Sequence, residues 1–262
     1  MRREQSQQRR PVESPGLPAK KPVGALFLVG VPIGHSDDIT IRALGVLSLA
    51  DVIASENPIA TQELLRHHNL SAVLTSYGPT RIKEKVAILI DRLQQGMSVA
   101  LVSDCGSPVI SDPGSLLVVA AHKYSIPVHS IPGPSAVTAA MAVAGFSAEA
   151  FHFYGNMPTP TGSDKHRLAM ALTHTEPTIL FCQTTSCLAI LEAIAKTAPR
   201  RKIALACDLT QQQERLMRGT ARLILEQLKR IRLPQAITMI VAGTSRKKRK
   251  ELDQRTSRSP LA

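Results

Sequence analysis

Short apolar runs alternate with helix-like segments along most of this chain, and this alternation limits the possible folds more than any other feature. We predict strands at residues 26–30, 52–54, 99–102, 128–131, 151–154, 178–183, 203–207 and 237–242. Between them we predict a helix that begins after the N-cap Thr40, and helices at residues 61–68, 81–95, 114–124, 135–144, 165–172, 186–196 and 221–230. Strands that alternate with helices are typical of α/β proteins, so we expect an α/β fold.

Breaks in composition divide the chain into four parts. A Pro-Gly-Pro break at residues 132–134 predicts a boundary between one α/β domain at 24–132 and a second at 133–243. Residues 1–23 predict a disordered basic arm of net charge +4, and residues 244–262 a short basic tail of +5. These ends hold most of the net charge of +12. They could bind phosphates or serve only as solubilising arms, and both interpretations stay open.

Several classes of protein are disfavoured by what the sequence lacks. It has no run of about 18 apolar residues, so we expect no membrane span, and it begins without the apolar segment of a secretory signal. The four cysteines include no C-x-x-C pair, and His67-His68 has no further ligand at metal-site spacing. We therefore expect a cytoplasmic protein with no metal site.

Three loops of ligand-binding type follow predicted strands. They read Gly-Val-Pro-Ile-Gly at residues 30–34, Ser-Asp-Cys-Gly-Ser-Pro-Val-Ile-Ser-Asp-Pro-Gly at 103–114, and Pro-Gly-Pro-Ser-Ala at 132–136. Open α/β sheets bind ligands at the carboxyl ends of their strands, and the third loop leads into a helix whose amino terminus suits an anionic group. The standard dinucleotide and P-loop motifs are absent. Together the loops predict a nucleotide-like ligand.

These same loops carry a resemblance to a known family. The three loops, with Asp-Ile-Thr at residues 38–40 and Arg-Gly-Thr at 218–220, resemble the ribosomal RNA small-subunit methyltransferase I family of the tetrapyrrole methylase superfamily, from about residue 25 to 243. The resemblance implies a two-domain tetrapyrrole-methylase-like fold with the ligand cleft between the domains. It also implies a homodimer that uses S-adenosyl-L-methionine to methylate a cytidine ribose 2′-hydroxyl in small-subunit (16S) rRNA, on the RNA or the ribosomal subunit.

The resemblance also implies roles for particular residues. A ribose hydroxyl has a high pKa, so a general base should help, and the acids in the right segments are Glu56, Asp208 and Glu214. Glu56 is our first choice because it follows a strand end. Arg167 and Arg218 are candidates for binding RNA phosphates. We expect Asp112 to cap the following helix. The cofactor site is expected to comprise Pro32, Ser103, Asp104, Gly106, Ser107, Pro108, Ser135 and Ala136.

The chain departs from the family pattern on the presumed substrate side. Residues 57–59 read Asn-Pro-Ile where the family has Asp-Thr-Arg, and Gln183, Thr184 and Cys187 replace Glu, Ser and Arg. Two alternatives therefore stay open. One is a methyltransferase that acts on another acceptor, and the other is a catalytically weak, ribosome-associated protein that binds the cofactor and RNA.

Overall fold

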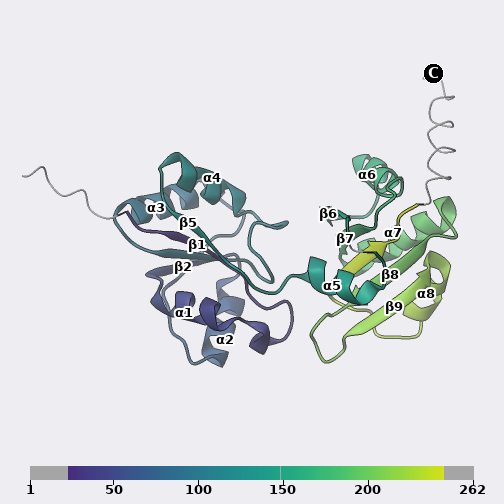
Figure 1. The fold of residues 1–262 in the computed structure, drawn as a ribbon, viewed down its shortest axis with the longest axis horizontal. Coiled ribbons are helices and arrows are strands. Elements are labelled where there is room, and N and C mark those ends of the chain that lie inside the picture. The colour runs from purple at the N-terminus through teal and green to yellow at the C-terminus, as the bar shows by residue number, and fades with distance from the viewer. Residues whose placement is uncertain (1–22, 148, 245–262) are drawn as a thin grey trace, which may run out of the picture.

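A five-stranded parallel sheet forms the first half of the structure, a computed structural model that describes residues 23–147 and 149–244 (Figure 1). Its strands lie in the order β3-β2-β4-β1-β5. In chain order they are β1 (Leu26–Val29), β2 (Val52–Ser55), β3 (Leu74–Ser76), β4 (Val99–Val102) and β5 (Val128–Ile131). Strands β2 and β4 are buried along their whole length. Parallel strands covered on both faces need such continuous apolar sequences, which is why these short runs form the centre of the sheet.

Helices cover both faces of this sheet. The short helix η1 (Ser36–Asp38) follows β1, and α1 (Ile41–Leu49) and α2 (Pro58–His67) pack on one face around residues such as Leu47, Ile53 and Leu65. Helices α3 (Ile82–Gln94) and α4 (Ser115–Lys123) pack on the other, around residues such as Leu89 and Leu101. Thr40 caps α1 as predicted, because its hydroxyl accepts a hydrogen bond from the Ala43 amide at 3.1 Å.

A mixed sheet forms the second half, with strand order β6-β7-β10-β8-β9. Its strands are β6 (His152–Asn156), β7 (Thr178–Cys182), β8 (Lys202–Cys207), β9 (Arg215–Thr220) and β10 (Ile237–Val241). Only β6 and β7 pair in parallel. Helix α5 (Ala136–Ala144) covers one face through residues such as Met141. The opposite face carries α6 (Ser163–Ala171), α7 (Thr184–Thr197) and α8 (Ala221–Leu228).

The predicted α/β class is confirmed, and two strands were missed. Strand β3 has only three residues, and β9 reads Arg-Leu-Met-Arg-Gly-Thr, with Met217 as its one fully buried side chain. Neither segment has the apolar content on which the strand predictions depended. Strand β9 forms because it pairs along its whole length with β8, a long-range contact that local sequence does not encode. Across the described ranges, no helix combines the length and apolar content needed to cross a membrane.

Loops of the two sheets meet beyond β1 and β8. The His35 amide donates a hydrogen bond to the Thr210 hydroxyl at 2.9 Å. Gly34 lies so close to this loop that a Cβ there would be 2.5 Å from the Leu209 carbonyl oxygen. The same holds for Gly155 in β6, where a Cβ would lie 2.8 Å from the Ser111 hydroxyl. Loops from the first sheet are therefore in contact with the second sheet at two points.

Candidate functional site

The three ligand-type loops come together at one edge of the first sheet. Strands β4, β1 and β5 are neighbours, so the loops after them leave the sheet side by side. Val31 and Gly106 form an antiparallel bridge with hydrogen bonds of 2.9 and 3.1 Å, which joins the first loop to the second. The Gly30 amide donates to the Ile131 carbonyl at 3.0 Å, which joins the first loop to the end of β5. The juxtaposition expected from the sequence is therefore present.

Glycines allow this close approach. A Cβ on Gly133 would lie 2.7 Å from the Gly30 carbonyl oxygen, and a Cβ on Gly30 would lie 2.8 Å from the Gly133 backbone. Gly106 has a φ of +75°, in the left-handed region that L side chains rarely adopt. The backbones of the three loops therefore meet without intervening side chains, and the loops after β1 and β4 border an open space.

That space is an open cleft of about 580 Å³, within the usual size range of small-molecule sites. One wall is the loop after β1, the second is helix α2, and the third is the start of the loop after β4. Contrary to the expectation of a cleft between the two domains, all of its lining residues come from the first half of the chain: Val31, Pro32, Ile33, Gly34, Ser36, Ala60, Thr61, Glu63, Leu64, Arg66, His67, Ser103, Asp104 and Cys105.

Three of the eight expected cofactor residues, Pro32, Ser103 and Asp104, line this cleft. The buried Ser103 hydroxyl donates to the carbonyls of Cys105 and Gly106, at 3.2 and 3.4 Å, and so fixes the turn that presents Asp104. Gly106 does not line the cleft, but it forms a bridge to Val31, which does. The remaining expected residues, Ser107, Pro108, Ser135 and Ala136, are outside its lining.

Three carboxyl groups lie close together beside the cleft: Glu56 after β2, and Asp104 and Asp112 in the loop after β4. Burial raises the pKa of Glu56, and the negative charges of Asp112 and Asp104 raise it further. Burial also raises the pKa of Asp104. The pKa of Asp112 is raised to about 6, mainly by burial, and the nearby Ser103 hydroxyl opposes this shift. These carboxyl groups are therefore protonated more readily than ordinary exposed ones.

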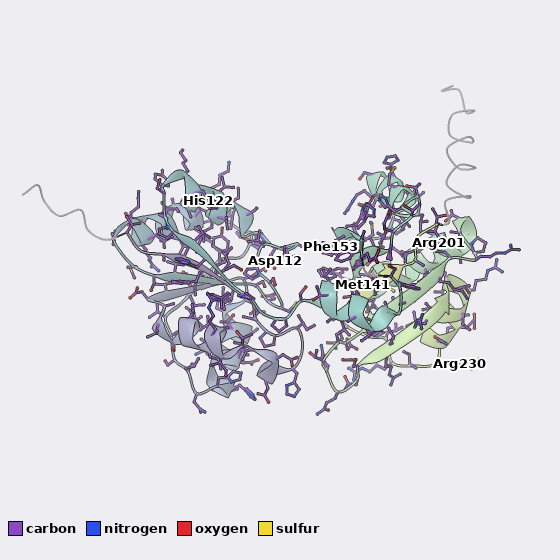
Figure 2. All side chains as sticks on the ribbon, in the orientation of Figure 1. Asp112, His122, Met141, Phe153, Arg201 and Arg230 are labelled. Atoms are coloured by element: carbon purple, nitrogen blue, oxygen red, sulfur yellow. The ribbon has the colours of Figure 1, made fainter. Side chains whose placement is uncertain are left out.

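Asp112 does not cap the following helix, contrary to expectation. The N-cap position of α4 is Gly114, and no side chain hydrogen-bonds to the first turn of that helix. Asp112 instead lies at the edge of the first sheet that faces the second, as Figure 2 shows. It lines a small internal space with Glu56 and Tyr77. The Tyr77 hydroxyl is buried, and burial raises its pKa to about 12.

The loop after β4 is held in a strained conformation. Val109 has a φ of +76° and Ser111 a φ of +68°. Left-handed backbone is unusual for any residue with a side chain and most unfavourable for a β-branched one. Each such residue costs of order 1–3 kcal/mol and persists only where the surroundings enforce it, most often at functional sites.

The other two candidate bases have structural partners. The buried Asp208 carboxylate accepts hydrogen bonds from the amides of Gln235 and Ala236, both at 2.9 Å, and so anchors the chain before β10. The exposed Glu214 carboxylate accepts one from the Thr210 amide at 2.6 Å. Neither lines the cleft beside Asp104. Glu56 is the one of the three that lies in the acidic group.

The two candidate arginines differ in how firmly they are held. The half-buried Arg167 donates to the Asp164 carboxylate and to the Tyr154 carbonyl, both at 2.9 Å. Arg218 is exposed on β9, stacks over the Phe146 ring at 5.7 Å and donates to the Gly145 carbonyl at 3.4 Å. Arg218 thus presents the freer guanidinium.

Sequence reasoning assigned no role to Tyr77 or to the histidines His67 and His68 beside the cleft, and it treated Asp112 as a helix cap. The strand order could have suggested Asp112, because β2 and β4 are neighbours and their loops must meet. No local signal marks Tyr77, which lies just after the unpredicted strand β3.

Comparison with known proteins identifies the family. Residues 25–224 match the model of the tetrapyrrole (corrin/porphyrin) methylases. The ribosomal RNA small subunit methyltransferase I of Thermotoga maritima is 34% identical over 222 residues, which cover 84% of this chain and 99% of that protein.

Solved structures show the same fold. Cobalt-precorrin-4 methyltransferase, a cobalamin biosynthetic enzyme, superposes with a TM-score of 0.65 at 18% identity over 83% of this chain and 94% of its own. Uroporphyrin-III C-methyltransferase from Thermus thermophilus, solved with S-adenosyl homocysteine, gives a TM-score of 0.62 at 15% identity, with 84% and 97% of the chains covered. This chain therefore belongs to the tetrapyrrole methylase family of methyltransferases, in its ribosomal RNA small subunit methyltransferase I branch.

Proposed function

We propose that the protein transfers a methyl group from S-adenosyl-L-methionine to the ribose 2′-hydroxyl of a cytidine in small-subunit (16S) rRNA. The observation that carries the proposal is the 34% identity to the ribosomal RNA small subunit methyltransferase I of Thermotoga maritima, over nearly the whole length of that protein. We further propose that it acts as a cytoplasmic homodimer, on the rRNA or the small ribosomal subunit. We also propose that the boundary between the two α/β domains lies near residue 133.

The cleft suits such a cofactor. Its loops place backbone groups beside the space without intervening side chains, and the Asp104 carboxylate lies on its wall, where it can offset a positive charge. When bound, the cofactor supplies a methyl group on a positively charged sulfur. Pro32, Ser103 and Asp104 would contact it directly. Gly106, Ser107, Pro108, Ser135 and Ala136 would shape the loops around it.

Glu56 is the base that the arrangement favours. Its raised pKa makes its carboxylate a better proton acceptor than an ordinary exposed glutamate, although still far weaker than an alkoxide. Asp208 and Glu214 would keep the loop after β8 in place rather than accept the proton. Arg218 would bind an RNA phosphate, and Arg167 would hold α6 against β6 through the Tyr154 carbonyl.

The first test is transfer of a tritiated methyl group from S-adenosyl-L-methionine to small ribosomal subunits that lack the ribose methyl. We expect the wild-type protein to label one ribose in the rRNA. Asp104→Ala should weaken cofactor binding in calorimetry, and Glu56→Gln should slow transfer by about 10²–10⁴-fold without changing that affinity. Labelling of a small molecule in RNA-free extract, with none in rRNA, would contradict the proposed acceptor.

The role of Asp208 is tested separately in the same assay. Asp208→Asn retains an oxygen that can accept from Gln235 and Ala236, whereas Asp208→Ala does not. A structural Asp208 therefore predicts that the asparagine variant keeps most of the activity and the alanine variant loses it. Equal loss in both variants, with the fold intact, would instead make Asp208 the base.

A further inference from the structure

A cluster of metal-binding side chains lies on the rim of the cleft. Asp37 belongs to η1, and His67 and His68 lie at the carboxyl end of α2. Their ligand atoms all lie within 4.8 Å of one another. The Asp37 Oδ1 and His67 Nε2 atoms are 2.7 Å apart. Asp37 is thus a third candidate ligand. The sequence spacing around the two histidines does not reveal it.

The donor atoms favour one class of metal ion. Two imidazole nitrogens and one carboxylate oxygen suit Zn²⁺ and related transition-metal ions, whereas Mg²⁺ and Ca²⁺ prefer oxygen ligands alone. Zinc sites with three protein ligands keep a fourth position open for water or another ligand. The cluster therefore resembles an open site more than a closed structural one.

To accept an ion, the ligand atoms, which lie within 4.8 Å of one another, must move to zinc-site spacing. Ligand atoms about 2.0–2.1 Å from a tetrahedral zinc ion lie roughly 3.3 Å from one another. Asp37 and His67 must therefore separate by about half an ångström. His68 can keep the contact between its Nε2 and the Ser36 carbonyl, at 3.0 Å, if it ligates the ion through Nδ1. Asp37 and His67 are exposed, so their separation does not disturb the core.

The backbone on the Asp37 side is already ordered. The Asp37 amide donates to His35 Nδ1 at 3.2 Å, and the Asp38 amide donates to the His35 carbonyl at 3.0 Å. The neighbouring amide of His35 is in turn bound to Thr210. The carboxylate therefore projects from a turn that is fixed on both sides, which lowers the entropy lost when an ion binds.

We propose that Asp37, His67 and His68 bind one divalent transition-metal ion of the zinc class, with an open coordination position. The ion would tie the loop after β1 to the end of α2. Those two segments form two walls of the cleft, so metal binding would fix the width of its mouth. This inference does not depend on the identity of the methyl acceptor.

The test is a titration of the metal-free, full-length protein with CoCl₂ and, separately, ZnCl₂, with MgCl₂ as a control. We expect one equivalent of Co²⁺ to give visible absorption bands of a site with nitrogen and oxygen ligands, and Zn²⁺ to displace it. Calorimetry should show one equivalent of Zn²⁺ and no Mg²⁺ binding. His67→Ala and Asp37→Ala should each weaken Co²⁺ binding at least about tenfold.

Two control variants separate this site from other metal-binding groups. His122 is an exposed histidine on α4, which packs on the opposite face of the sheet from α2, and His122→Ala should leave the titration unchanged (Figure 2). Cys105 is an exposed thiol on the cleft wall, and Cys105→Ser should also leave it unchanged. Circular dichroism checks that every variant is folded.

Three results would overturn the proposal. The first is no Co²⁺ binding by the wild-type protein, which would leave a simple Asp37–His67 pair. The second is binding that His67→Ala does not weaken. The third is binding that Cys105→Ser abolishes, which would assign the ion to the thiol.

Discussion

Asp112 shows how the strained loop after β4 changes the chemistry of a single residue. Asp112 follows the left-handed residues Val109 and Ser111 and lines one small space with Glu56 and Tyr77. Backbone strain and the close placement of carboxyl groups both cost free energy, and both involve the loop after β4. Such accumulated local costs are expected where a loop is built for binding or catalysis rather than for stability.

This arrangement predicts that Asp112→Asn stabilises the protein above neutral pH. The pKa of Asp112 is raised from 3.8 to about 6 in the folded state, so folding favours its protonated form. Its stabilising contribution is therefore complete below the unfolded pKa and is lost as the pH rises through about 6. A shift of about two units corresponds to nearly 3 kcal/mol, which solvent screening reduces to about 1 kcal/mol.

Urea denaturation at pH 8 and pH 4 measures this effect. Asp112→Asn should raise the free energy of unfolding at pH 8 by about 1 kcal/mol and have a smaller effect at pH 4. Asp91→Asn, on the exposed surface of α3, is the control and should show no such dependence. A variant of Asp112 that is less stable at pH 8 than the wild type would mean that its charge has a favourable partner.

At the scale of elements, the sequence predicts regular structure well and strained structure poorly. The run at residues 99–102 coincides with β4 because continuous apolar sequence is what a doubly covered parallel strand requires. Strand β9 was not predicted, because its Arg-Leu-Met-Arg-Gly-Thr sequence forms a strand only through pairing with β8. The left-handed backbone of Val109 was not predicted either, because a valine rarely adopts that conformation.

The candidate site shows the same division. The three loops could be predicted because each follows a recognisable strand, and parallel strands bring their carboxyl ends to one edge. The partners of Asp208 and the grouping of Asp37 with His67 could not be predicted. They depend on tertiary contacts across 27 or more residues of chain, which no local pattern records.

The contact between Gly30 and Gly133 is the element-scale feature most open to test. Gly133→Ala would place a Cβ 2.7 Å from the Gly30 carbonyl oxygen, where only backbone can give way. We expect it to push the loops after β1 and β5 apart and to lower the free energy of unfolding by about 1–3 kcal/mol. Cofactor affinity should fall as well, because those loops frame the proposed site.

Gly45→Ala is the matched control for that change. Gly45 lies within α1, and a Cβ there would meet nothing within 4 Å. Alanine should therefore stabilise the helix by up to about 1 kcal/mol and leave cofactor affinity unchanged. Thermal denaturation and calorimetry of both variants measure the two effects. Equal behaviour of Gly133→Ala and Gly45→Ala would show that the loop contact has no role.

At the scale of the whole molecule, the candidate site residues come from both halves of the chain. The cleft is lined by loops of the first sheet and by helix α2, whereas Asp208, Glu214 and Arg218 all belong to the second half of the chain. The contacts of Gly34 with Leu209 and of Gly155 with Ser111 bring loops of the second half against the cleft loops. The strained loop and the loop after β1 therefore both lie on the side of the first sheet that faces the second.

The positive charge of the chain bears on its proposed binding to RNA. The basic run Arg-Lys-Lys-Arg-Lys at residues 246–250 lies outside the described residues, so its role is inferred from sequence alone. If these residues contact RNA phosphates, each contact releases condensed counterions and steepens the salt dependence of binding. A tail that serves only solubility would leave that dependence unchanged.

Replacing the five basic residues with glutamine distinguishes these two roles. Binding to small-subunit rRNA should be measured from low to high salt, and the slope of log K against log salt compared with the wild type. With a slope of about 0.7–0.9 per phosphate, the loss of all five contacts would reduce it by about 3.5–4.5. Arg218→Gln should reduce it by about one, because a single guanidinium is removed. A slope unchanged by the tail variant, with normal solubility and unaltered methyl transfer, would exclude residues 246–250 from the RNA interface and leave the second sheet to supply the phosphate contacts.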